Sequence, residues 1–181
     1  MSLALVLGGA RSGKSRFAEH LAQDRVSVLT RRMLYVATAQ ISDDEMAHRV
    51  QEHQSRRGEG WYTVEEPLHV GHLLQEQADW PVVVVDCLSL LLNNWIWMED
   101  CDENQFLQRQ NDLVDSLSHY VGQVICVSNE VGQGIVPDNA LARQYRDWLG
   151  WLNQAVAKVA DEVFWVVAGI PVDVKKFEAR V

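Results

Sequence analysis

The feature of the sequence that most constrains its fold is the glycine-rich stretch GGARSGKS at residues 8–15. It follows the apolar run LALVL at 3–7 and precedes a helical pattern at 14–23, in which we expect Phe17 and Leu21 to face inward. Glycines at such a junction let backbone N–H groups close around phosphate oxygens at a helix N-terminus, where the helix dipole favours anions. A glycine-rich turn that binds nothing is the alternative, but the order of strand, loop and helix favours a phosphate-binding loop.

The pattern G-x-x-x-x-G-K-[ST] assigns chemical roles within this loop. Lys14 is predicted to reach the β- and γ-phosphates of a nucleoside triphosphate, and the Ser15 hydroxyl to bind Mg²⁺. A second oxygen ligand for Mg²⁺ is expected at the end of a neighbouring strand, where Asp86 closes the apolar run VVVVD. Asp86 could instead, or in addition, be the N-cap of a helix that begins in CLSLLL.

Short apolar runs alternate with helical patterns along the whole chain. Runs without polar alternation are typical of strands that are buried on both faces. They lie at 3–7, 33–38, 81–87, 123–129 and 162–169, while 61–66 is either a strand or an extended connection. Amphipathic patterns predict helices at 106–117 and 141–159, the second of them starting at Pro137-Asp138. The alternation predicts an α/β fold: one P-loop NTPase domain over residues 1–181, with a mainly parallel sheet and helices on both faces.

The charge of the chain limits the classes of ligand that it is expected to bind. The formal net charge of −9 argues against a general nucleic-acid binder, which needs a broad basic surface. Residues 1–57 nevertheless hold nine Lys/Arg and six Asp/Glu, a net charge of +3, and the remainder carries −12. A basic segment in an acidic protein favours a small anionic ligand bound at one place, with chance clustering as the alternative.

The cysteines and the apolar runs suggest a compartment. The three cysteines form no CxxC pair, and Cys87 and Cys126 lie in or beside apolar runs where we expect buried thiols, so a reducing cytoplasm is predicted. No apolar run approaches the roughly 20 residues that span a bilayer, and no membrane span is expected.

A second segment that calls for a function is QISDDEMAHRVQEHQSRR at residues 40–57. Ser42 and Glu45 form a capping box, which predicts a helix start, and Arg49 and His53 then share its inward face with Met46 and Val50. His53 could be a helix-end histidine that complements the dipole. It could also be a nucleophile, because a neutral imidazole can attack phosphorus and form a phosphoramidate.

Five segments in this order resemble one enzyme family. They are GGARSGKSRFAE, YVATAQISDDEMAHRVQEHQSRR, WYTVEEP, VDCLSLLLNN and NEVGQGIVPDNALARQYRDWLGWLNQAVA, and they extend over nearly the whole chain. The chain is similar to adenosylcobinamide kinase/adenosylcobinamide-phosphate guanylyltransferase, the bifunctional transferase of the nucleotide-loop stage of cobalamin biosynthesis. The phosphate loop alone is generic, whereas the histidine segment and NEVGQGIVP are specific.

The resemblance implies two reactions and a RecA-like fold. The family phosphorylates the aminopropanol hydroxyl of adenosylcobinamide with ATP or GTP. It then transfers GMP from GTP to the resulting phosphate through a GMP-histidine intermediate, and His53 is the matching position. The product is adenosylcobinamide-GDP. The family is also a homotrimer with sites between subunits.

The resemblance also carries over the nucleotide-binding residues. They are Gly8, Gly9, Ala10, Arg11, Ser12, Gly13, Lys14, Ser15, Ala37, Thr38, Ala39, Gln54, Ser55, Arg56, Arg57, Glu65 and Asp86, with His53 and Lys14 as catalytic residues and Ser15 and Asp86 on the metal. The link before residue 33 is longer than usual in the family, so Arg31 and Arg32 are expected on an exposed excursion.

Rival functions remain at this point. A plain P-loop small-molecule kinase would leave His53 structural, and a nucleotide-binding assembly subunit would show no corrinoid-dependent turnover. The preference for ATP or GTP, and the choice of Glu65 or Asp86 as base for the corrinoid hydroxyl, stay open. The segment from Asn129 to Pro137 could contact the corrinoid, contact another subunit or simply form a turn.

Overall fold

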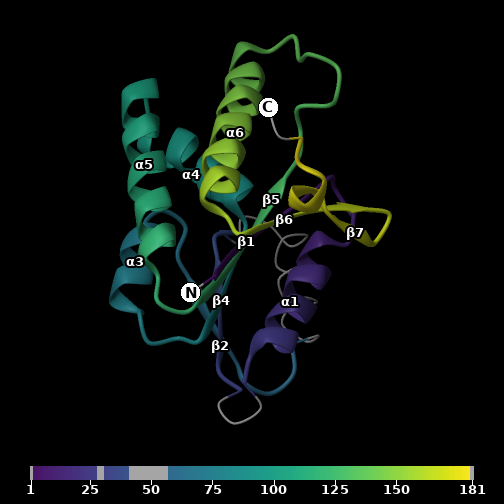
Figure 1. The fold of residues 1–181 in the computed structure, drawn as a ribbon. Coiled ribbons are helices and arrows are strands. Elements are labelled where there is room, and N and C mark those ends of the chain that lie inside the picture. The colour runs from purple at the N-terminus through teal and green to yellow at the C-terminus, as the bar shows by residue number, and fades with distance from the viewer. Residues whose placement is uncertain (1, 28–30, 41–56, 180–181) are drawn as a thin grey trace.

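The computed structural model describes residues 2–27, 31–40 and 57–179, which fold around one sheet (Figure 1). The seven strands are ordered β3-β2-β4-β5-β1-β6-β7. Their bounds are β1 Ser2–Gly8, β2 Met33–Ala37, β3 Trp61–Glu65, β4 Val82–Asp86, β5 Gln123–Asn129, β6 Glu162–Val167 and β7 Ile170–Asp173. The predicted α/β class with a mainly parallel sheet is confirmed, because among the described strands only β7 pairs antiparallel.

The last strand is a feature that the sequence prediction missed. The apolar run at 162–169 was expected to form one strand, but β6 ends at Val167. Ala168 and Gly169 have positive φ values of 51° and 79° and turn the chain back into β7. For residues 61–66 the sequence left a strand or an extended connection open. The structure has a strand there, because β3 pairs with β2 along its whole length.

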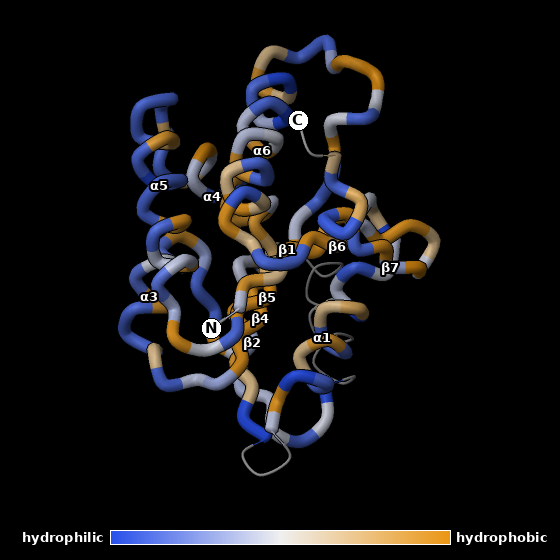
Figure 2. The backbone as a smooth tube through the Cα atoms, in the orientation of Figure 1, coloured by the Kyte–Doolittle hydropathy of each residue, from blue (hydrophilic) through white to orange (hydrophobic). Residues whose placement is uncertain are grey.

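Two apolar clusters lie on opposite faces of the sheet. Leu5, Val83 and Val85 belong to the larger cluster, which packs under the helices α3 (Val70–Glu76), α4 (Leu88–Glu99), α5 (Glu103–His119) and α6 (Ala140–Val159). Val6 and Val84 face the other way, under α1 (Lys14–Arg25). Successive strand residues point to opposite faces of the sheet, so the same strands supply both clusters. The hydrophobic residues concentrate along the strands at the centre of the molecule (Figure 2).

The helix starts follow local capping chemistry. Asp102 caps α5 through a capping box with Gln105. Helix α6 begins at Ala140, not at Pro137-Asp138 as expected, because the Asn139 side chain accepts a hydrogen bond from Ala142 N and makes Asn139 the N-cap. After β7 the chain forms a 3-10 turn, η1 (Val174–Phe177).

Helix α1 presents a narrower buried face than its pattern predicted. Phe17 and Leu21 are half-buried against the sheet, whereas Ala18, Glu19 and Ala22 are buried. Small alanines let the helix approach the strands closely, and they leave a buried glutamate among them. Arg31 and Arg32 are exposed, as expected. Among the described residues, no helix is long and apolar enough to cross a bilayer.

Phe106 provides a test of the larger core. Its side chain is fully buried and stacks on Trp148 with ring centroids 4.6 Å apart. Replacing Phe106 with Ala should lower the free energy of unfolding by about 3–5 kcal/mol, because a ring-sized cavity remains. Urea denaturation measures this. The control Leu107→Ala, at an exposed neighbour, should change it by at most about 0.5 kcal/mol; equal losses would contradict the assigned packing.

Candidate nucleotide-binding site

The carboxyl ends of the parallel strands meet at one edge of the sheet. Gly8 pairs with Asn129, and Ala37 lies between Asp86 and Glu65 in the strand register. Ligand sites of open α/β sheets form at this edge. The pairing therefore brings the phosphate loop, the predicted metal ligand and two predicted nucleotide contacts to the same side of the molecule.

Backbone hydrogen bonds hold the phosphate loop in place. Gly13 has φ +94°, in the left-handed region, and α1 starts directly after it at Lys14. Ser12 N donates to Gly9 O at 3.3 Å, and Ser12 O accepts from Gly169 N at 2.8 Å. The loop residues Gly9, Ala10, Arg11 and Gly13 are exposed. The result is an exposed loop at a helix N-terminus, as the motif predicts.

Ser12 and Gly8 define the tightest point of the loop. The Ser12 hydroxyl is buried and has no hydrogen-bond partner within the described structure. A Cβ atom on Gly8 would lie 2.5 Å from that hydroxyl and 2.7 Å from Val166 O. Only glycine fits at position 8, and the Ser12 hydroxyl is a group that a bound ligand could satisfy.

Lys14 and Ser15 occupy the first turn of α1. The Lys14 ammonium donates to Gly9 O at 3.2 Å, so in this structure it closes over the loop that it is predicted to serve. Ser15 is half-buried beside it. A cavity of about 310 Å³ adjoins the loop and is lined by residues 9–12, 165–168, Glu130 and Gln133.

Asp86 is held by a tyrosine from the neighbouring strand. Tyr35 Oη donates to Asp86 Oδ2 at 2.9 Å. Burial, followed by the negative charge of Asp86, raises the pKa of Tyr35 well above its ordinary value, so the hydroxyl keeps its proton and remains a donor. The N-cap alternative for Asp86 is wrong, because Cys87 occupies the N-cap of α4 and no side chain caps that helix.

Thr38 and Cys87 tie β2 to β4 just beyond this point. The buried Thr38 hydroxyl donates to Cys87 O and accepts from Cys87 N, at 2.8 and 2.7 Å. Burial, followed by the charge of Asp86, raises the pKa of Cys87 to about 11, which favours a neutral thiol near pH 7. The positive charge of Lys14 opposes that rise.

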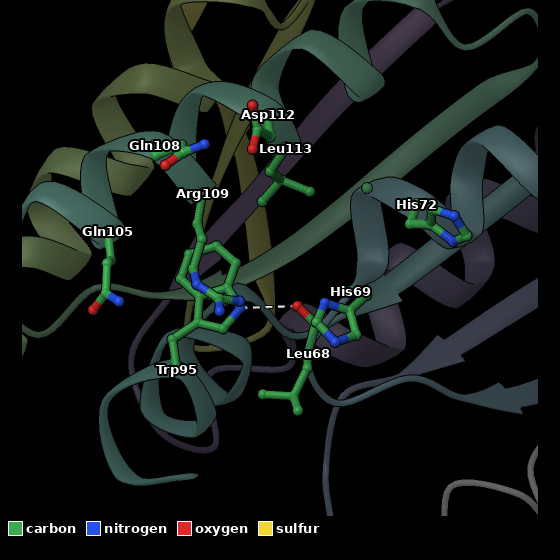
Figure 3. Close-up of a pocket in the computed structure, with 10 residues that line it drawn as sticks. Leu68, His69, His72, Trp95, Gln105, Gln108, Arg109, Asp112 and Leu113 are labelled. Atoms are coloured by element: carbon green, nitrogen blue, oxygen red, sulfur yellow. Dashed lines mark hydrogen bonds between the residues drawn. The ribbon is translucent and has the colours of Figure 1, made fainter. Parts of the chain in front are cut away.

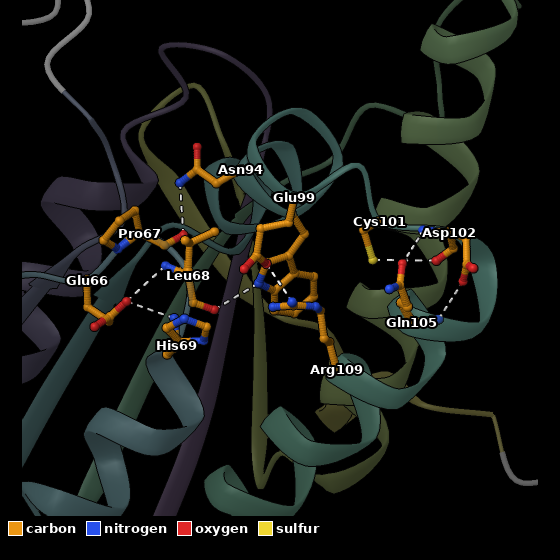
Figure 4. A network of polar contacts seen from close by, with 11 residues as sticks. Glu66, Pro67, Leu68, His69, Asn94, Glu99, Cys101, Asp102, Gln105 and Arg109 are labelled. Carbon is orange, nitrogen blue, oxygen red and sulfur yellow. Dashed lines mark hydrogen bonds and ion pairs between the residues drawn. The ribbon is translucent and has the colours of Figure 1, made fainter.

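A polar network continues from Thr38 to α4, and Figure 4 shows its part around Asn94, Leu68 and Glu66. Asn94 Nδ2 donates to Thr38 O and to Pro67 O, both at 2.9 Å. Trp95 Nε1 donates to Leu68 O, and Glu66 accepts from the backbone N–H groups of Leu68 and His69. These bonds fix the segments that follow β2 and β3 against α4, and so keep the sheet edge in one shape.

A groove of about 410 Å³ lies beside this network, between α3, α4 and α5 (Figure 3). Leu68, Trp95 and Leu113 are its apolar lining residues, and Arg109 lies over the Trp95 ring and pairs with Glu99. The helices that line it cover the opposite face of the sheet from α1, so the groove is separate from the phosphate loop.

The other residues that are predicted to contact the nucleotide differ in how far they are exposed. Ala37 and Ala39 are half-buried, and Glu65 is exposed at the end of β3. The Arg57 side chain is only 4 % exposed and lies over the Tyr35 ring, 3.6 Å from its centroid. His53, Gln54, Ser55 and Arg56, with the expected helix that starts at Ser42, lie outside the described residues. Their roles stay predictions.

The oxygen ligands at the edge suit Mg²⁺. Asp86 offers a carboxylate beside β2 and Ser15 a hydroxyl at the start of α1, and the described residues form no cluster of three or more metal-ligating side chains. Mg²⁺ is usually bound through one or two carboxylates, substrate phosphates and waters, so an oxygen pair of this kind fits its chemistry.

Two residues at this site, Tyr35 and Glu19, were missed from the sequence. Tyr35 stands in an apolar strand, where it reads as a core residue, and Glu19 reads as part of a helix surface. The sequence did hold one indication that Glu19 is buried. Glu19 directly follows Ala18 and lies three residues before Ala22, so a helix that packs on the sheet with these alanines also turns Glu19 towards the sheet.

The loop after β5 forms turn structure in its first residues. Glu130 Oε1 accepts from Gly132 N at 2.7 Å, and Asn129 O accepts from the Asn153 side chain. Ile135 and Val136 are exposed. Turn structure is therefore present, while the two contact roles stay predictions.

Gly8 gives a direct test of the loop geometry. Gly8→Ala should weaken GTP binding at least about tenfold, because the new methyl group displaces Ser12 or β6 at a typical overpacking cost of about 1–3 kcal/mol. Isothermal titration with GTP measures this. The control Gly150→Ala, whose Cβ would meet nothing within 4 Å, should bind GTP as the parent protein does. Unchanged binding in Gly8→Ala would refute the geometry.

Known proteins similar to this chain identify its family. Residues 4–174 match the family described as cobinamide kinase / cobinamide phosphate guanyltransferase. The bifunctional adenosylcobalamin biosynthesis protein CobP of Pseudomonas aeruginosa is 43 % identical over 173 residues, which cover 94 % of this chain and 96 % of that protein. The proteins of the same description named CobU, from Escherichia coli and Salmonella typhimurium, are 39 % and 38 % identical and cover 96 % of this chain and 99 % of their own lengths.

Among solved structures, a KaiC-like protein of Pyrococcus horikoshii has a TM-score of 0.47 and 14 % identity, over 91 % of this chain and 70 % of its own. The RecA-like character implied by the resemblance stays a prediction. The extent of the sequence match decides the family, and this chain belongs to the cobinamide kinase / cobinamide phosphate guanyltransferase family.

Proposed function

We propose that the chain is a two-step transferase formed by one domain over residues 1–181. It phosphorylates the aminopropanol hydroxyl of adenosylcobinamide, and then transfers GMP from GTP to that phosphate, giving adenosylcobinamide-GDP. The observation that carries the proposal is the match to the family over residues 4–174, together with a phosphate loop and Asp86 at one sheet edge.

In the kinase step, the phosphate loop positions the triphosphate and Lys14 neutralises the charge that develops on the transferred phosphoryl group. The corrinoid hydroxyl oxygen bonds to the γ-phosphorus, the bond to the β-phosphate oxygen breaks, and a nucleoside diphosphate leaves. The hydroxyl proton passes to a base, for which Glu65 and Asp86 are the candidates. Ser15 and Asp86 would hold Mg²⁺, which supplies positive charge to the phosphate oxygens when bound. ATP and GTP are both candidate phosphoryl donors.

In the guanylyl step, His53 is the proposed nucleophile. An imidazole nitrogen bonds to the α-phosphorus of GTP and pyrophosphate leaves, so GMP is held on the histidine. The phosphate oxygen of adenosylcobinamide phosphate then attacks the same phosphorus and releases the imidazole. Two easier displacements thereby replace one difficult displacement between two anions.

Covalent labelling tests the second step. Protein incubated with Mg²⁺ and GTP labelled at the α-phosphate should retain acid-labile, base-stable label after denaturation. His53→Ala should carry none, and the control His48→Ala, which removes an imidazole from the same segment, should be labelled as the parent protein is. No label on folded, GTP-binding parent protein would leave a plain kinase or a binding subunit.

We also propose a cytoplasmic homotrimer with sites between subunits. A surface that could support it lies beside the phosphate loop, where Trp165, Val167, Ile170, Val172 and Phe177 expose apolar side chains on β6, β7 and η1. Trp165 and Val167 also line the cavity next to the loop. A second copy seated there would lie close to the nucleotide.

Substitution of this surface tests the assembly. Ile170 and Phe177 are 65 % and 79 % exposed, so replacing both with Glu should leave the fold intact. Light scattering coupled to gel filtration should then show the mass of a monomer, because buried charges oppose association. Val121→Glu, at a 75 % exposed site before β5, should remain trimeric. A parent protein that is itself monomeric would refute the trimer.

A further inference from the structure

A buried polar chain connects α1 with the predicted metal ligand. Its members are Glu19 on α1, Arg57 before β3, Tyr35 on β2 and Asp86 at the end of β4. Arg57 Nε lies 4.0 Å from Glu19 Oε1, and the two side chains are only 4 % and 7 % exposed. The two opposite charges are thus buried side by side, and each offsets part of the desolvation cost of the other.

Arg57 in turn holds Tyr35. Its guanidinium carbon lies 3.6 Å from the centroid of the Tyr35 ring, within the range of a strong cation–π contact. The Tyr35 ring also meets Trp61 edge-to-face, with centroids 6.2 Å apart. With a cation on its face and an indole at its edge, the ring has one orientation.

That orientation directs the Tyr35 hydroxyl at Asp86. The 2.9 Å bond to Oδ2 gives one of the two carboxylate oxygens a hydrogen-bond donor and restricts rotation of the group. Tyr35 and Asp86 lie on neighbouring strands, where Tyr35 pairs with Val84 and Ala37 pairs with Asp86. The ring therefore reaches forward along the strand direction to the sheet edge.

We propose that Tyr35, Arg57 and Glu19 are positioning residues that orient the Asp86 carboxylate for the metal–nucleotide complex. The inference rests on the proposed function, which needs Mg²⁺ at Asp86. It also gives Arg57 a different task from the direct nucleotide contact that the family resemblance implies: Arg57 acts through the Tyr35 ring. Partners that orient metal ligands typically change metal affinity by about 10–100-fold when removed.

Tyr35→Phe isolates the hydroxyl, because the ring, its stacking and its packing are retained. The measurement is the affinity for Mn²⁺, used in place of Mg²⁺, by electron paramagnetic resonance with a non-hydrolysable GTP analogue present. The affinity should fall at least about tenfold, while analogue binding without metal should change by less than about twofold. Tyr62→Phe is the matched control, an exposed tyrosine on β3. It should leave both values unchanged.

A double-mutant cycle separates the two tasks of Arg57. Arg57→Lys keeps the charge but loses the planar stacking. It should weaken Mn²⁺ binding in the parent protein. In the Tyr35→Phe background it should cause no further loss, because both changes act through the same hydroxyl group. Glu19→Gln should behave in the same way with a smaller loss. If Arg57→Lys weakens metal-free analogue binding, or if the losses in Mn²⁺ affinity add, Arg57 contacts the nucleotide and the inference is wrong.

The cycle is independent of catalysis. Binding of Mn²⁺ and analogue needs neither a corrinoid nor a histidine adduct, so absence of covalent label in the parent protein refutes the guanylyl step alone. Unchanged Mn²⁺ affinity in a folded Tyr35→Phe protein, as judged by its thermal unfolding temperature, refutes the inference alone.

Discussion

The parallel register of β2 and β4 is the constraint on which the site depends. It sets Ala37 beside Asp86 and places Tyr35 two residues earlier on the same strand face, from which only a long side chain reaches the carboxylate. The Thr38–Cys87 hydrogen bonds then close the two strand ends against each other. A slip of one residue would turn Tyr35 to the opposite face, and Asp86 would lose its hydrogen-bond donor.

The two faces of the sheet serve different purposes. Four of the described helices cover one face and provide most of the apolar core, which agrees with the large buried cluster there. The other face carries α1, the phosphate loop and the chain from Glu19 to Asp86. Burying a charged pair under a helix is costly. A large apolar core on the opposite face is the part of the fold that can offset such a cost.

Much of this arrangement could be predicted from the sequence. Continuous apolar runs located five strands, and the glycine-rich motif located the loop between β1 and α1. Helix α3 was missed because it has only seven residues. Strand β7 was missed because it has only four residues and its apolar residues are exposed. The start of α6 was misplaced because Asn139, rather than the proline before it, caps the helix.

The support of the site could not be predicted in the same way. Tyr35 and Asp86 are 51 residues apart, and Arg57 and Glu19 are connected only through the fold. A motif names residues that touch a ligand and carries no information on which distant side chains hold them. In isolation Tyr35 has the appearance of an ordinary strand residue, and its role becomes visible only in three dimensions.

The hydrogen bond from Gly169 to Ser12 has a consequence for motion. It joins the phosphate loop to the turn of the β6–β7 hairpin, at the end of the sheet where β7 has no further strand beside it. Edge elements open more readily than central strands. The backbone of the phosphate loop is thus tied to the outermost hairpin, so local opening of that hairpin would free the Ser12 carbonyl group and loosen the loop.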